Sequence, residues 1–493
     1  MHKLVSSRAA LEADRIAETS FGYPSWLLME EAGIRLQDRL EAWVAEGTVP
    51  EGPTVYLAGS GNNGGDALVM ARQGFLRGRT GITVVMVFPP SSEACRRQAA
   101  LVRALGIPLY EGVSEAEDAL AGASVWVDGV WGTGLAGSPR PERRAVLSRL
   151  EELRARLNKP CLAIDVPSGL WDGYRTGDPV LRARWTLTPG WLKDFCFHPE
   201  ARNAVGKVLE VTLAFPKPAE SSGELLERAD LPGLLPRVAS EDHKGKRGHV
   251  VLVGGAPGMT GALVLAARSA AASGAGLVSL GVDPGLTSVI SPQVPAFQVR
   301  EVDTLNHLIP RYDAAVVGPG WGHTQDRPEF LQMFWATDLP LVVDADGLAA
   351  WVSASPGPRT APVVLTPHPG EFARLGVPGA PVVAAVELAR NKNVTVVLKG
   401  AVTWILAPDG RRAVWDGANP ALGTGGSGDC LAGVVGALLA RGLGGFEAAR
   451  AAVVLHGEAG RILAEHEGWF TADRLPEALA RTAAACMAGL GRL

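Results

Sequence analysis

The chain has 493 residues, which is too long for one ordinary hydrophobic core and favours two domains. Hydrophobic residues make up 47% of it and charged residues 20%, a balance typical of globular proteins. The formal net charge of −4 gives no basic field over the whole chain, so nucleic acid is not expected as a partner.

The five cysteines are scattered and form no CxxC pair, which fits a reducing cytoplasm and argues against a disulfide framework or a zinc site. The N-terminal residues contain no apolar stretch of signal-peptide length. No uncharged run reaches about 18 apolar residues, so we expect a cytoplasmic protein without a membrane span.

Helix-like and strand-like segments alternate through the first half of the chain. The expected helices cover 8–20, 25–36 with Ser25 as cap, 67–76, 92–105 and 141–157. The expected strands cover 53–58, 82–88, 124–127, 161–164 and 206–213. This alternation predicts βαβ units, and therefore a Rossmann-like, doubly wound α/β domain.

Three loops that follow predicted strands carry acidic or amide side chains. The first, GSGNNGGD at 59–66, satisfies the GxGxxG fingerprint. The next strand, however, ends at 87–90 without the acid that holds the ribose in a nicotinamide dehydrogenase. The other two loops contain Asp128 and Asp165. For either aspartate alone, a role in a turn or a helix cap is as good an interpretation as a role in a site. Because ligands collect beyond the carboxyl ends of parallel strands, we expect the three loops to form one site.

A segment of linker composition separates the two predicted domains. The first domain is assigned to 1–215, the linker to 216–229 and the second domain to 230–493. In the second domain the expected strands cover 249–253, 277–282, 314–317, 340–343, 363–365 and 394–398, and a helix covers 261–272. Strands again alternate with helices, so this domain is also predicted to be α/β.

The run GTGGSGD at 423–429 precedes a small apolar segment, 430–440, that is predicted to be a buried helix. Glycines allow successive backbone N–H groups to converge, and at a helix N-terminus these groups bind anions. A carboxylate at Asp429 would repel a resting phosphate, so its presence indicates a base beside the phosphate that reacts. The helix dipole is expected to keep Asp429 ionised near neutral pH. The alternative is a glycine-rich turn with Asp429 as a helix cap.

Other loops of the second half carry groups suited to phosphate or metal. Lys399 and Thr403 offer a cation and a hydroxyl for phosphate. Asp344 and Asp346 are equally suited to holding magnesium and to capping a helix. His243 and His249 are interpreted as ordinary surface or core histidines.

The first half resembles the N-terminal epimerase domain of the bifunctional NAD(P)H-hydrate repair enzymes. The matching segments are GYPSWLLMEEAG at 22–33, GSGNNGGD at 59–66, DGVWGTGL at 128–135 and DVPSGL at 165–170. The resemblance implies that Asn63, Asp128 and Ser168 hold a potassium ion and that Asp165 is the acid/base. It implies contacts with the hydrated cofactor from Asn62, Asn63, Gly64, Gly65, Asp66, Gly132, Thr133, Gly134, Leu135, Ala136, Gly137, Ser138 and Asp165.

The second half resembles the ribokinase-like, ADP-dependent dehydratase domain of the same family. The matching segments are HKG at 243–245, GPGWG at 318–322, DADGL at 344–348, LTPHPGE at 365–371, GTGGSGD at 423–429 and HGEAG at 456–460. The resemblance implies contacts with the hydrated cofactor from Ala262, Gly320, His368 and Asp429. It implies contacts with ADP or AMP from Lys399, Gly400, Ala401, Val402, Thr403 and Gly428.

Together the two resemblances imply a bifunctional metabolite repair enzyme. It would interconvert the R and S forms of hydrated NAD(P)H and dehydrate the S form at the expense of ADP, releasing AMP and phosphate. In this hypothesis Asp429 takes the proton of the ring hydroxyl, whose oxygen attacks the terminal phosphoryl of ADP. The implied cofactors are potassium and Mg²⁺, with ADP as co-substrate. The expected partners are hydrated NADH and NADPH, ADP and further copies of the chain in a homo-oligomer.

Two alternatives stay open. The second domain could be a ribokinase-type small-molecule kinase, because a kinase also deprotonates a hydroxyl beside a phosphate. A kinase would release a stable phosphoester, whereas a dehydratase would release free phosphate and a reduced nicotinamide. The first domain could be a non-catalytic binding module, although the polar groups of its three loops together argue against this.

Overall fold

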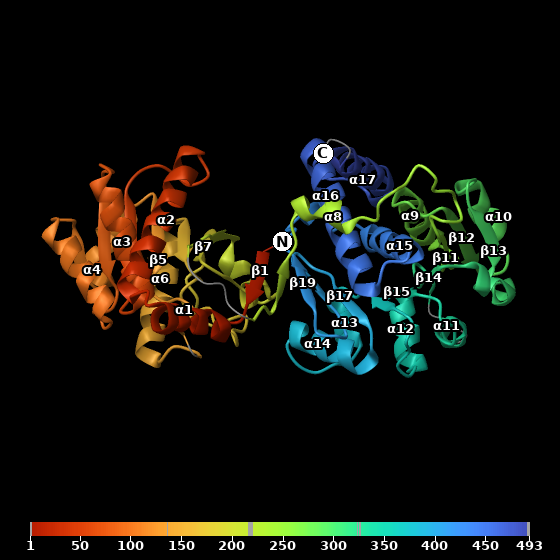
Figure 1. Ribbon diagram of the computed structural model, residues 1–493, viewed down its shortest axis with the longest axis horizontal. Coiled ribbons are helices and arrows are strands. Elements are labelled where there is room, and N and C mark those ends of the chain that lie inside the picture. Colours follow the sequence, from red (N-terminus) through yellow and green to blue (C-terminus); the bar gives the residue numbers. More distant parts are fainter. Residues whose placement is uncertain (1, 136, 215–219, 323, 325–326, 491–493) are drawn as a thin grey trace. The chain divides into compact units, whose positions relative to one another are not determined.

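The computed structural model describes residues 2–135, 137–214, 220–322, 324 and 327–490, and the chain divides into two compact units. The N-terminal unit comprises residues 2–223, and the C-terminal unit begins at Glu224 (Figure 1). The predicted linker at 216–229 starts in residues that lie outside the described ones. Its later part contains strand β10 (Gly223–Leu225), which pairs with a strand of the C-terminal unit.

The N-terminal unit is built on a parallel sheet with the strand order β4-β3-β2-β5-β6-β7-β9. Its strands are β2 (Thr54–Ala58), β3 (Ile82–Met86), β4 (Leu109–Glu111), β5 (Val125–Gly129), β6 (Cys161–Ile164), β7 (Trp185–Pro189) and β9 (Lys207–Val211). A further parallel pair joins β1 (His2–Val5) to β8 (Leu192–Lys193). The helices are α1 (Ser7–Phe21), α2 (Ser25–Ala45), α3 (Asn62–Leu76), α4 (Glu93–Ala104), α5 (Glu117–Gly122), α6 (Pro141–Arg156) and α7 (Arg202–Val205).

Helices cover both faces of this sheet. Tyr56 and Val84 pack with residues of α2, α3 and α4 in one core cluster, whereas Leu57 and Val85 pack with residues of α5 and α6 in another. Successive side chains of a strand point to opposite faces, so burial on both sides requires continuous apolar strands. The predicted Rossmann-like, doubly wound domain is therefore confirmed.

The C-terminal unit is built on a larger sheet with the order β13-β12-β11-β14-β15-β16-β17-β18-β19-β10. Neighbouring strands are parallel except at β17–β18 and β18–β19, which are antiparallel. The strands are β11 (His249–Val253), β12 (Leu277–Val282), β13 (Gln298–Glu301), β14 (Ala314–Val317), β15 (Leu341–Val343), β16 (Val363–Leu365), β17 (Thr395–Leu398), β18 (Thr403–Leu406) and β19 (Arg412–Trp415).

Two groups of helices enclose this second sheet. The helices are α8 (Leu231–Leu234), α9 (Thr260–Ala272), α10 (Thr287–Ile290), α11 (Arg327–Trp335), α12 (Asp346–Ala354), α13 (Pro369–Arg374), α14 (Pro381–Lys392), α15 (Ser427–Ala440), α16 (Gly445–Glu467) and α17 (Leu475–Leu490). In Figure 1, α9, α15, α16 and α17 lie on one side of the strands and α11 to α14 on the other. Helix α15 is buried along nearly its whole length, which explains why its sequence is small and apolar all round.

Some elements differ from the sequence-based expectations. Helix α3 begins at Asn62 rather than at residue 67, because Gly64 and Gly65 belong to the helix and not to the preceding loop. A Cβ on Gly64 would lie 2.1 Å from the carbonyl oxygen of Gly59, so close packing, and not helix propensity, selects glycine there. Ser25 is the first residue of α2, and Pro24 is the N-cap without a side-chain hydrogen bond, so the predicted cap is wrong. Strands β1, β4, β7, β8, β10, β13, β18 and β19 were not expected.

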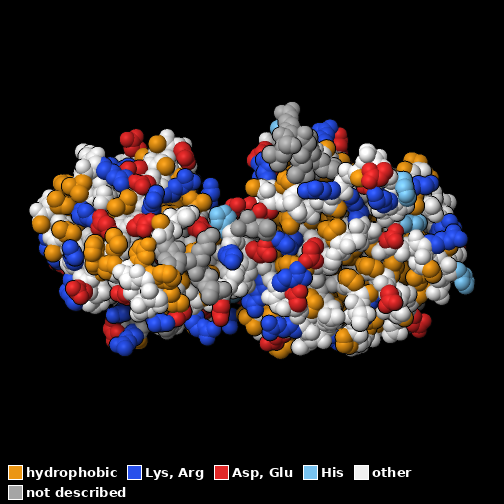
Figure 2. Space-filling view, viewed as in Figure 1, with side chains coloured by type: hydrophobic (Ala, Val, Ile, Leu, Met, Phe, Trp, Pro, Cys, Tyr) orange, Lys and Arg blue, Asp and Glu red, His pale blue; other side chains and the backbone are white. Residues whose placement is uncertain are grey.

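Acidic and basic side chains are interspersed over the visible face of each unit (Figure 2). Within the described residues no helix is both long and apolar enough to cross a membrane.

Helices α9 and α15 approach each other closely at Gly433, where a Cβ would lie 2.0 Å from the carbonyl oxygen of Ala266. We expect Gly433→Ala to lower the free energy of unfolding by about 1–3 kcal/mol, because the added methyl forces these helices apart. Gly261→Ala in α9 is the matched control, since a Cβ there meets nothing within 4 Å. Urea unfolding followed by circular dichroism measures both. Equal midpoints for the two variants would contradict the packing argument.

Candidate functional site

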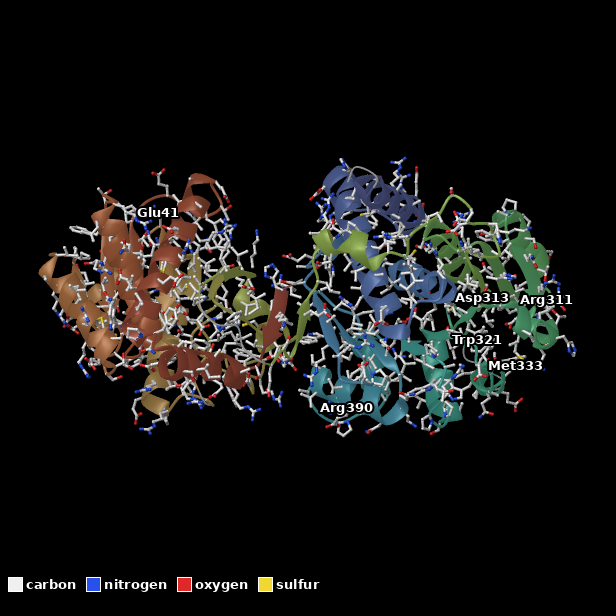
Figure 3. All side chains as sticks on the ribbon, viewed as in Figure 1. Glu41, Arg311, Asp313, Trp321, Met333 and Arg390 are labelled. Atoms are coloured by element: carbon white, nitrogen blue, oxygen red, sulfur yellow. The ribbon has the colours of Figure 1, made fainter. Side chains whose placement is uncertain are left out.

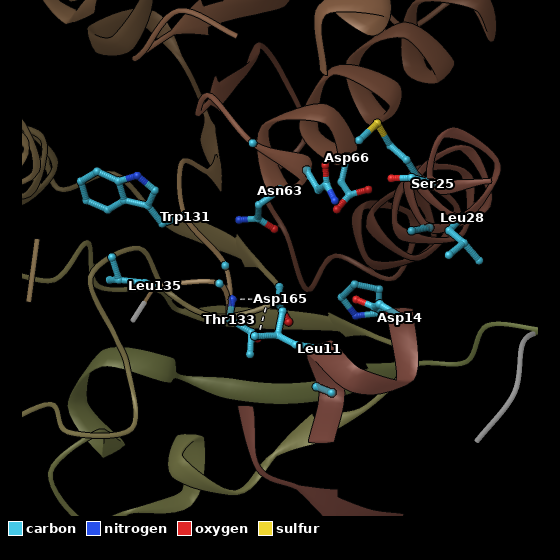
Figure 4. Close-up of a pocket in the computed structure, with 18 of the residues that line it drawn as sticks. Leu11, Asp14, Ser25, Leu28, Asn63, Asp66, Trp131, Thr133, Leu135 and Asp165 are labelled. Carbon is cyan, nitrogen blue, oxygen red and sulfur yellow. Dashed lines mark hydrogen bonds between the residues drawn. The ribbon is translucent and has the colours of Figure 1, made fainter. Parts of the chain in front are cut away.

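A pocket of about 570 Å³ opens at the carboxyl ends of the strands of the N-terminal unit (Figure 4). Helices α1 and α2, the start of α3 and the loops after β2, β5 and β6 form its wall. Eight of the residues expected to contact the hydrated cofactor line it: Asn62, Asn63, Asp66, Gly132, Thr133, Gly134, Leu135 and Asp165. Four others, Gly64, Gly65, Gly137 and Ser138, are not among the lining residues, and Ala136 lies outside the described residues.

The glycines of the GxGxxG run serve close packing. A Cβ on Gly59 would lie 1.8 Å from the carbonyl oxygen of Val130, and Gly64 lies equally tightly against Gly59. Gly61 has open space around its Cα. Two of the three glycines are therefore explained by the approach of the 59–66 segment to the neighbouring loop, without a dinucleotide.

Asp165 is held at the floor of the pocket by three donors. One carboxylate oxygen accepts hydrogen bonds from the backbone N–H of Thr133 at 2.6 Å and from its hydroxyl at 2.7 Å (Figure 4). The other oxygen accepts from the ammonium of Lys193 at 2.5 Å. The residue itself has a φ of 69°, a strained conformation of the kind found at functional sites. These contacts fix one orientation of a carboxylate that faces the pocket.

Lys193 and Asp14 are lining residues that the sequence reasoning did not assign to the site. Lys193 comes from the short strand β8, which has no clear strand signal. Asp14 comes from α1, where it is one of several acidic residues on an amphipathic helix. Neither residue lies in a glycine-rich loop, so only the tertiary structure associates them with Asp165.

Asp128 and Ser168 form a buried polar pair beside this pocket. The serine hydroxyl donates to one carboxylate oxygen at 2.6 Å and its backbone N–H donates to the other at 2.8 Å. Burial raises the pKa of Asp128 to about 6, and the hydrogen bonds from Ser168 and Val130 partly offset this. Asn63 donates its amide to the carbonyl of Ile164, which leaves its side-chain oxygen as an acceptor.

These three residues suit a hard cation. Asn63, Asp128 and Ser168 offer only oxygen atoms, and a cation would relieve the cost of ionising a carboxyl that is wholly shielded from solvent. The donor set therefore fits the expected potassium ion in its chemistry.

In the C-terminal unit the expected residues follow four adjacent parallel strands, β14 to β17. Lys399, directly after β17, donates to Asp344 at 2.9 Å and lies 3.8 Å from Glu371. Asp344, directly after β15, also accepts from the hydroxyl of Thr366 at 2.7 Å. Asp346 begins α12 and accepts from the backbone N–H of Gly322 at 2.7 Å, so it ties two loops together and is not the N-cap.

Asp429 lies in the first turn of α15 and is partly exposed. Gly426 precedes the helix with a φ of 93°, and a Cβ on Gly428 would lie 3.1 Å from the ammonium of Lys399. The glycine run, its carboxylate and the lysine thus meet at one place, as the sequence predicts for a phosphate site.

The expectation that Asp429 stays ionised does not hold for the nucleotide-free protein. Burial, followed by the charge of Asp344, raises the pKa of Asp429 to about 7, and Lys399 offsets only part of this. The N-terminal partial charge of α15 does not outweigh a neighbourhood of carboxylates. Near neutral pH the proton on Asp429 is therefore easily lost or gained, which is the state that favours a general base.

The residues expected to contact the hydrated cofactor lie on loops of the same unit. Gly320 has a φ of 56°, and a Cβ on it would lie 2.9 Å from the Cβ of Ala262. His368 caps α13, because its Nδ1 accepts from the backbone N–H groups of Gly370 and Glu371. In neutral His368 the proton is therefore on Nε2, which lies 3.4 Å from a carboxylate oxygen of Glu371 on a half-exposed ring.

Buried groups behind these loops hold them in place. Arg327 makes two hydrogen bonds to Asp283, at 2.8 and 2.7 Å, and its guanidinium lies over the ring of Trp321. Trp321 belongs to the loop after β14 and is labelled in Figure 3. His456 donates from Nε2 to the carbonyl oxygen of Ser427 at 3.0 Å. Burial lowers the pKa of His456 to about 4, so it acts as a neutral donor that fixes the start of α15.

In the 399–403 segment the hydroxyl of Thr403 donates to the carbonyl of Gly400 at 3.2 Å, closing a tight turn before β18. Among the described residues no three carboxylates, thiols or imidazoles are placed to hold a metal ion by themselves. Magnesium at this site would therefore need oxygen atoms of a bound nucleotide or of water in addition to Asp344, Asp346 or Glu371.

Comparisons with known proteins match both halves of the chain. A family model described as NAD(P)H-hydrate dehydratase matches residues 250–481, and one described as YjeF-related protein N-terminus matches residues 26–195. The bifunctional NAD(P)H-hydrate repair enzyme Nnr of Moorella thermoacetica is 32% identical, over 94% of this chain and 93% of its own. That of Coxiella burnetii is 33% identical, over 95% and 96%. A solved ribokinase-like superfamily protein from Enterococcus faecalis aligns with 56% of this chain and 98% of its own, at a TM-score of 0.51 and 26% identity.

The charge of Asp344 raises the pKa of Asp429, so Asp344→Asn is expected to bring that pKa below 7. Carbon-13 NMR titration of labelled aspartate carboxyls measures the shift. The ionised form of Asp429 is then present at lower pH. The rate of any reaction that uses Asp429 as a base should therefore begin to rise at lower pH as well. Asp409→Asn, in an exposed turn of the same unit, is the control that should leave the Asp429 titration unchanged. An upward shift in Asp344→Asn would contradict this electrostatic account.

Proposed function

The chain belongs to the bifunctional NAD(P)H-hydrate repair enzymes, which combine an epimerase with a dehydratase, and we propose how its residues divide the work. The N-terminal unit interconverts the R and S hydrates of NADH and NADPH. The C-terminal unit dehydrates the S form at the expense of ADP and releases AMP and phosphate. The observation that carries the second assignment is the meeting of Asp429, Gly428 and Lys399 at the start of α15.

In the epimerase, Asp165 exchanges protons with the substrate at C6 of the hydrated ring, which carries both the ring nitrogen and the hydroxyl. Thr133 and Lys193 hold the carboxylate in position. The start of α3 and the 132–138 loop provide the polar groups that orient the hydrated cofactor.

Potassium belongs to the same proposal, with Asn63, Asp128 and Ser168 as its ligands. Bound there, it would supply a fixed positive charge beside the pocket. The support is the all-oxygen donor set and the cost of keeping the buried Asp128 ionised without a counterion.

In the dehydratase, Asp429 takes the proton of the ring hydroxyl, and that oxygen attacks the terminal phosphoryl of ADP. The backbone N–H groups of 423–428 stabilise the charge that develops on phosphate. Mg²⁺ held by Asp344, Asp346 or Glu371 would supply further positive charge there. Phosphate then leaves C6 with the former hydroxyl oxygen, C5 releases a proton to water, and the C5–C6 double bond of the ring returns. The 399–403 segment and Gly428 would bind the adenine nucleotide, while Ala262, Gly320 and His368 would bind the hydrated cofactor.

Family membership does not favour a ribokinase-type kinase. The relatives from Moorella thermoacetica and Coxiella burnetii are bifunctional repair enzymes that match nearly the full length of this chain.

We also propose a cytoplasmic location, supported by five cysteines that form no disulfide. Homo-oligomerisation is a further proposal, and light scattering on the purified protein measures it.

Reciprocal variants test the division of work. Asp429→Asn should lower dehydration by about 10²–10⁴-fold, since an amide cannot accept the hydroxyl proton, and should leave epimerisation intact. Asp165→Asn should lose epimerisation and keep dehydration. It should therefore restore NADH only from the S epimer in a mixture of both epimers. Absorbance of restored NADH and chromatography of the two epimers measure the activities. Wild-type dehydration by Asp429→Asn would rule out its role, and a phosphoester product would point to the kinase.

Potassium dependence tests the cation site. We expect epimerisation, but not dehydration, to slow when sodium replaces potassium, because the smaller ion fits the same oxygen set less well. Ser168→Ala should weaken this dependence, since it removes one oxygen ligand. Assays at constant ionic strength keep general salt effects apart. Epimerisation that is identical in both salts would refute the potassium assignment.

A further inference from the structure

Four carboxyl groups line the epimerase pocket, and three of them come from different elements. Asp14 lies on α1, Asp66 on α3, and Asp165 directly after β6 (Figure 4). Lys193 is the neighbouring cation, bonded to Asp165. The other charged residues that line the pocket are Arg15 and Glu18 on α1 and Arg143 on α6. The pocket therefore holds more acid groups than the single acid/base of the proposed reaction requires.

The three carboxyl groups are in different states. Asp165 is fully engaged by Thr133 and Lys193, as described above. In the described part of the chain the carboxyl of Asp14 accepts no hydrogen bond, and the residue is exposed at the pocket wall. Partial desolvation by that wall raises the pKa of Asp14 to about 6, against the opposing effect of Lys193, while the residue stays in contact with solvent.

Asp66 differs from Asp14 in how deeply the protein surrounds it. Burial, followed by the charges of Asp165 and Asp14, raises its pKa well above the usual range. Asp66 therefore holds its proton more firmly than an ordinary aspartate, which suits it to donating a hydrogen bond. Asp14 is the less enclosed of the two carboxyl groups and is the one exposed to solvent.

A reaction that works on both faces of the ring can use two proton-exchanging groups. The hydroxyls of the R and S hydrates point to opposite faces of the ring, and one carboxyl held in a fixed orientation reaches only one face. Asp165 is fixed by three donors, so it cannot serve both epimers in one binding pose. A second acid on another wall of the pocket removes this difficulty.

We propose that Asp14 is a second catalytic acid–base group of the epimerase pocket, working on the ring face opposite to Asp165. This inference rests on the epimerase activity proposed above and assigns it a further residue. Each epimer then meets one carboxyl on its hydroxyl face and one on the other.

The proposed step is balanced with solvent water as the only other reactant. Protonated Asp14 gives its proton to the C6 hydroxyl, the C6–O bond breaks with its electron pair on oxygen, and water leaves. The lone pair of N1 forms the C6–N1 double bond. A second water adds to C6 on the opposite face, returning that electron pair to N1, and Asp165 takes the proton it releases. The reverse direction uses the same two groups with their protonation states exchanged.

The main test is Asp14→Asn in the full-length chain. Its kcat for epimerisation should fall by about 10²–10⁴-fold in both directions, while KM for the hydrates changes little. The reaction requires one protonated and one ionised carboxyl group, so the epimerisation rate should show a bell-shaped pH profile. If Asp14 is the weaker acid of the pair, its loss of the proton sets the alkaline limb, near pH 6. In the variant only one group of the pair remains, so the alkaline limb should disappear.

Chemical rescue separates proton transfer from a structural role. Asp14→Ala leaves space for a small acid, so added formate should restore part of its epimerisation rate but should not help Asp14→Asn. Dehydration of the pure S hydrate by the same preparations reports that the C-terminal unit is folded, and rescue by formate reports that the N-terminal unit is. Asp118→Asn, an exposed change on α5, is the matched control and should epimerise like wild type.

Several outcomes would overturn the proposal. They are near-normal epimerisation by Asp14→Asn, a loss confined to KM, no rescue of Asp14→Ala by formate, or loss of the alkaline limb in Asp66→Asn instead. If wild-type protein does not interconvert the epimers, the proposed activity fails. If wild type does so and Asp14→Asn equals it, only the role of Asp14 fails.

Discussion

Parallel pairing of neighbouring strands is the constraint from which both candidate sites follow. Strands that run in the same direction end at one edge of the sheet, so the residues after each of them meet there. In the N-terminal unit this edge brings Asp165 to the loop that holds Thr133. In the C-terminal unit it brings Lys399 to Asp344, although 55 positions separate them in sequence. Helices begin at the same edge, and their N-terminal N–H groups point toward a ligand bound by the loops.

Each unit places one lysine among several carboxylates. Lys193 pairs with Asp165, and Lys399 pairs with Asp344 while lying near Glu371. Desolvation is the main cause of the raised pKa values of Asp14 and Asp429, the neighbouring carboxylates add to it, and the lysine offsets only part of the increase. Carboxyl groups gathered in a half-closed space thus titrate closer to neutral pH than ordinary aspartates do.

Local patterns were sufficient to predict the architecture but not every site residue. Continuous apolar runs such as 82–86 and the glycine run at 423–428 have local physical causes, so the central strands of both sheets and the presence of α15 could be predicted, although α15 begins at Ser427 rather than at residue 430. The start of α3 could not, because Gly64 and Gly65 are selected by contacts with Gly59 and Met29 rather than by helix propensity. Asp14 and Lys193 were missed for a related reason, since nothing near them in sequence indicates which wall they face. The protonation of Asp429 depends on charges from three other loops and is likewise not a local property.

Both catalytic units lie on one continuous polypeptide, and this fixes the ratio in which they are made. Every ribosome that finishes the chain delivers one epimerase and one dehydratase, so their ratio cannot drift with transcription, translation or turnover. A cell that makes this protein can raise or lower total repair capacity, but it cannot accumulate the S hydrate by making one partner without the other.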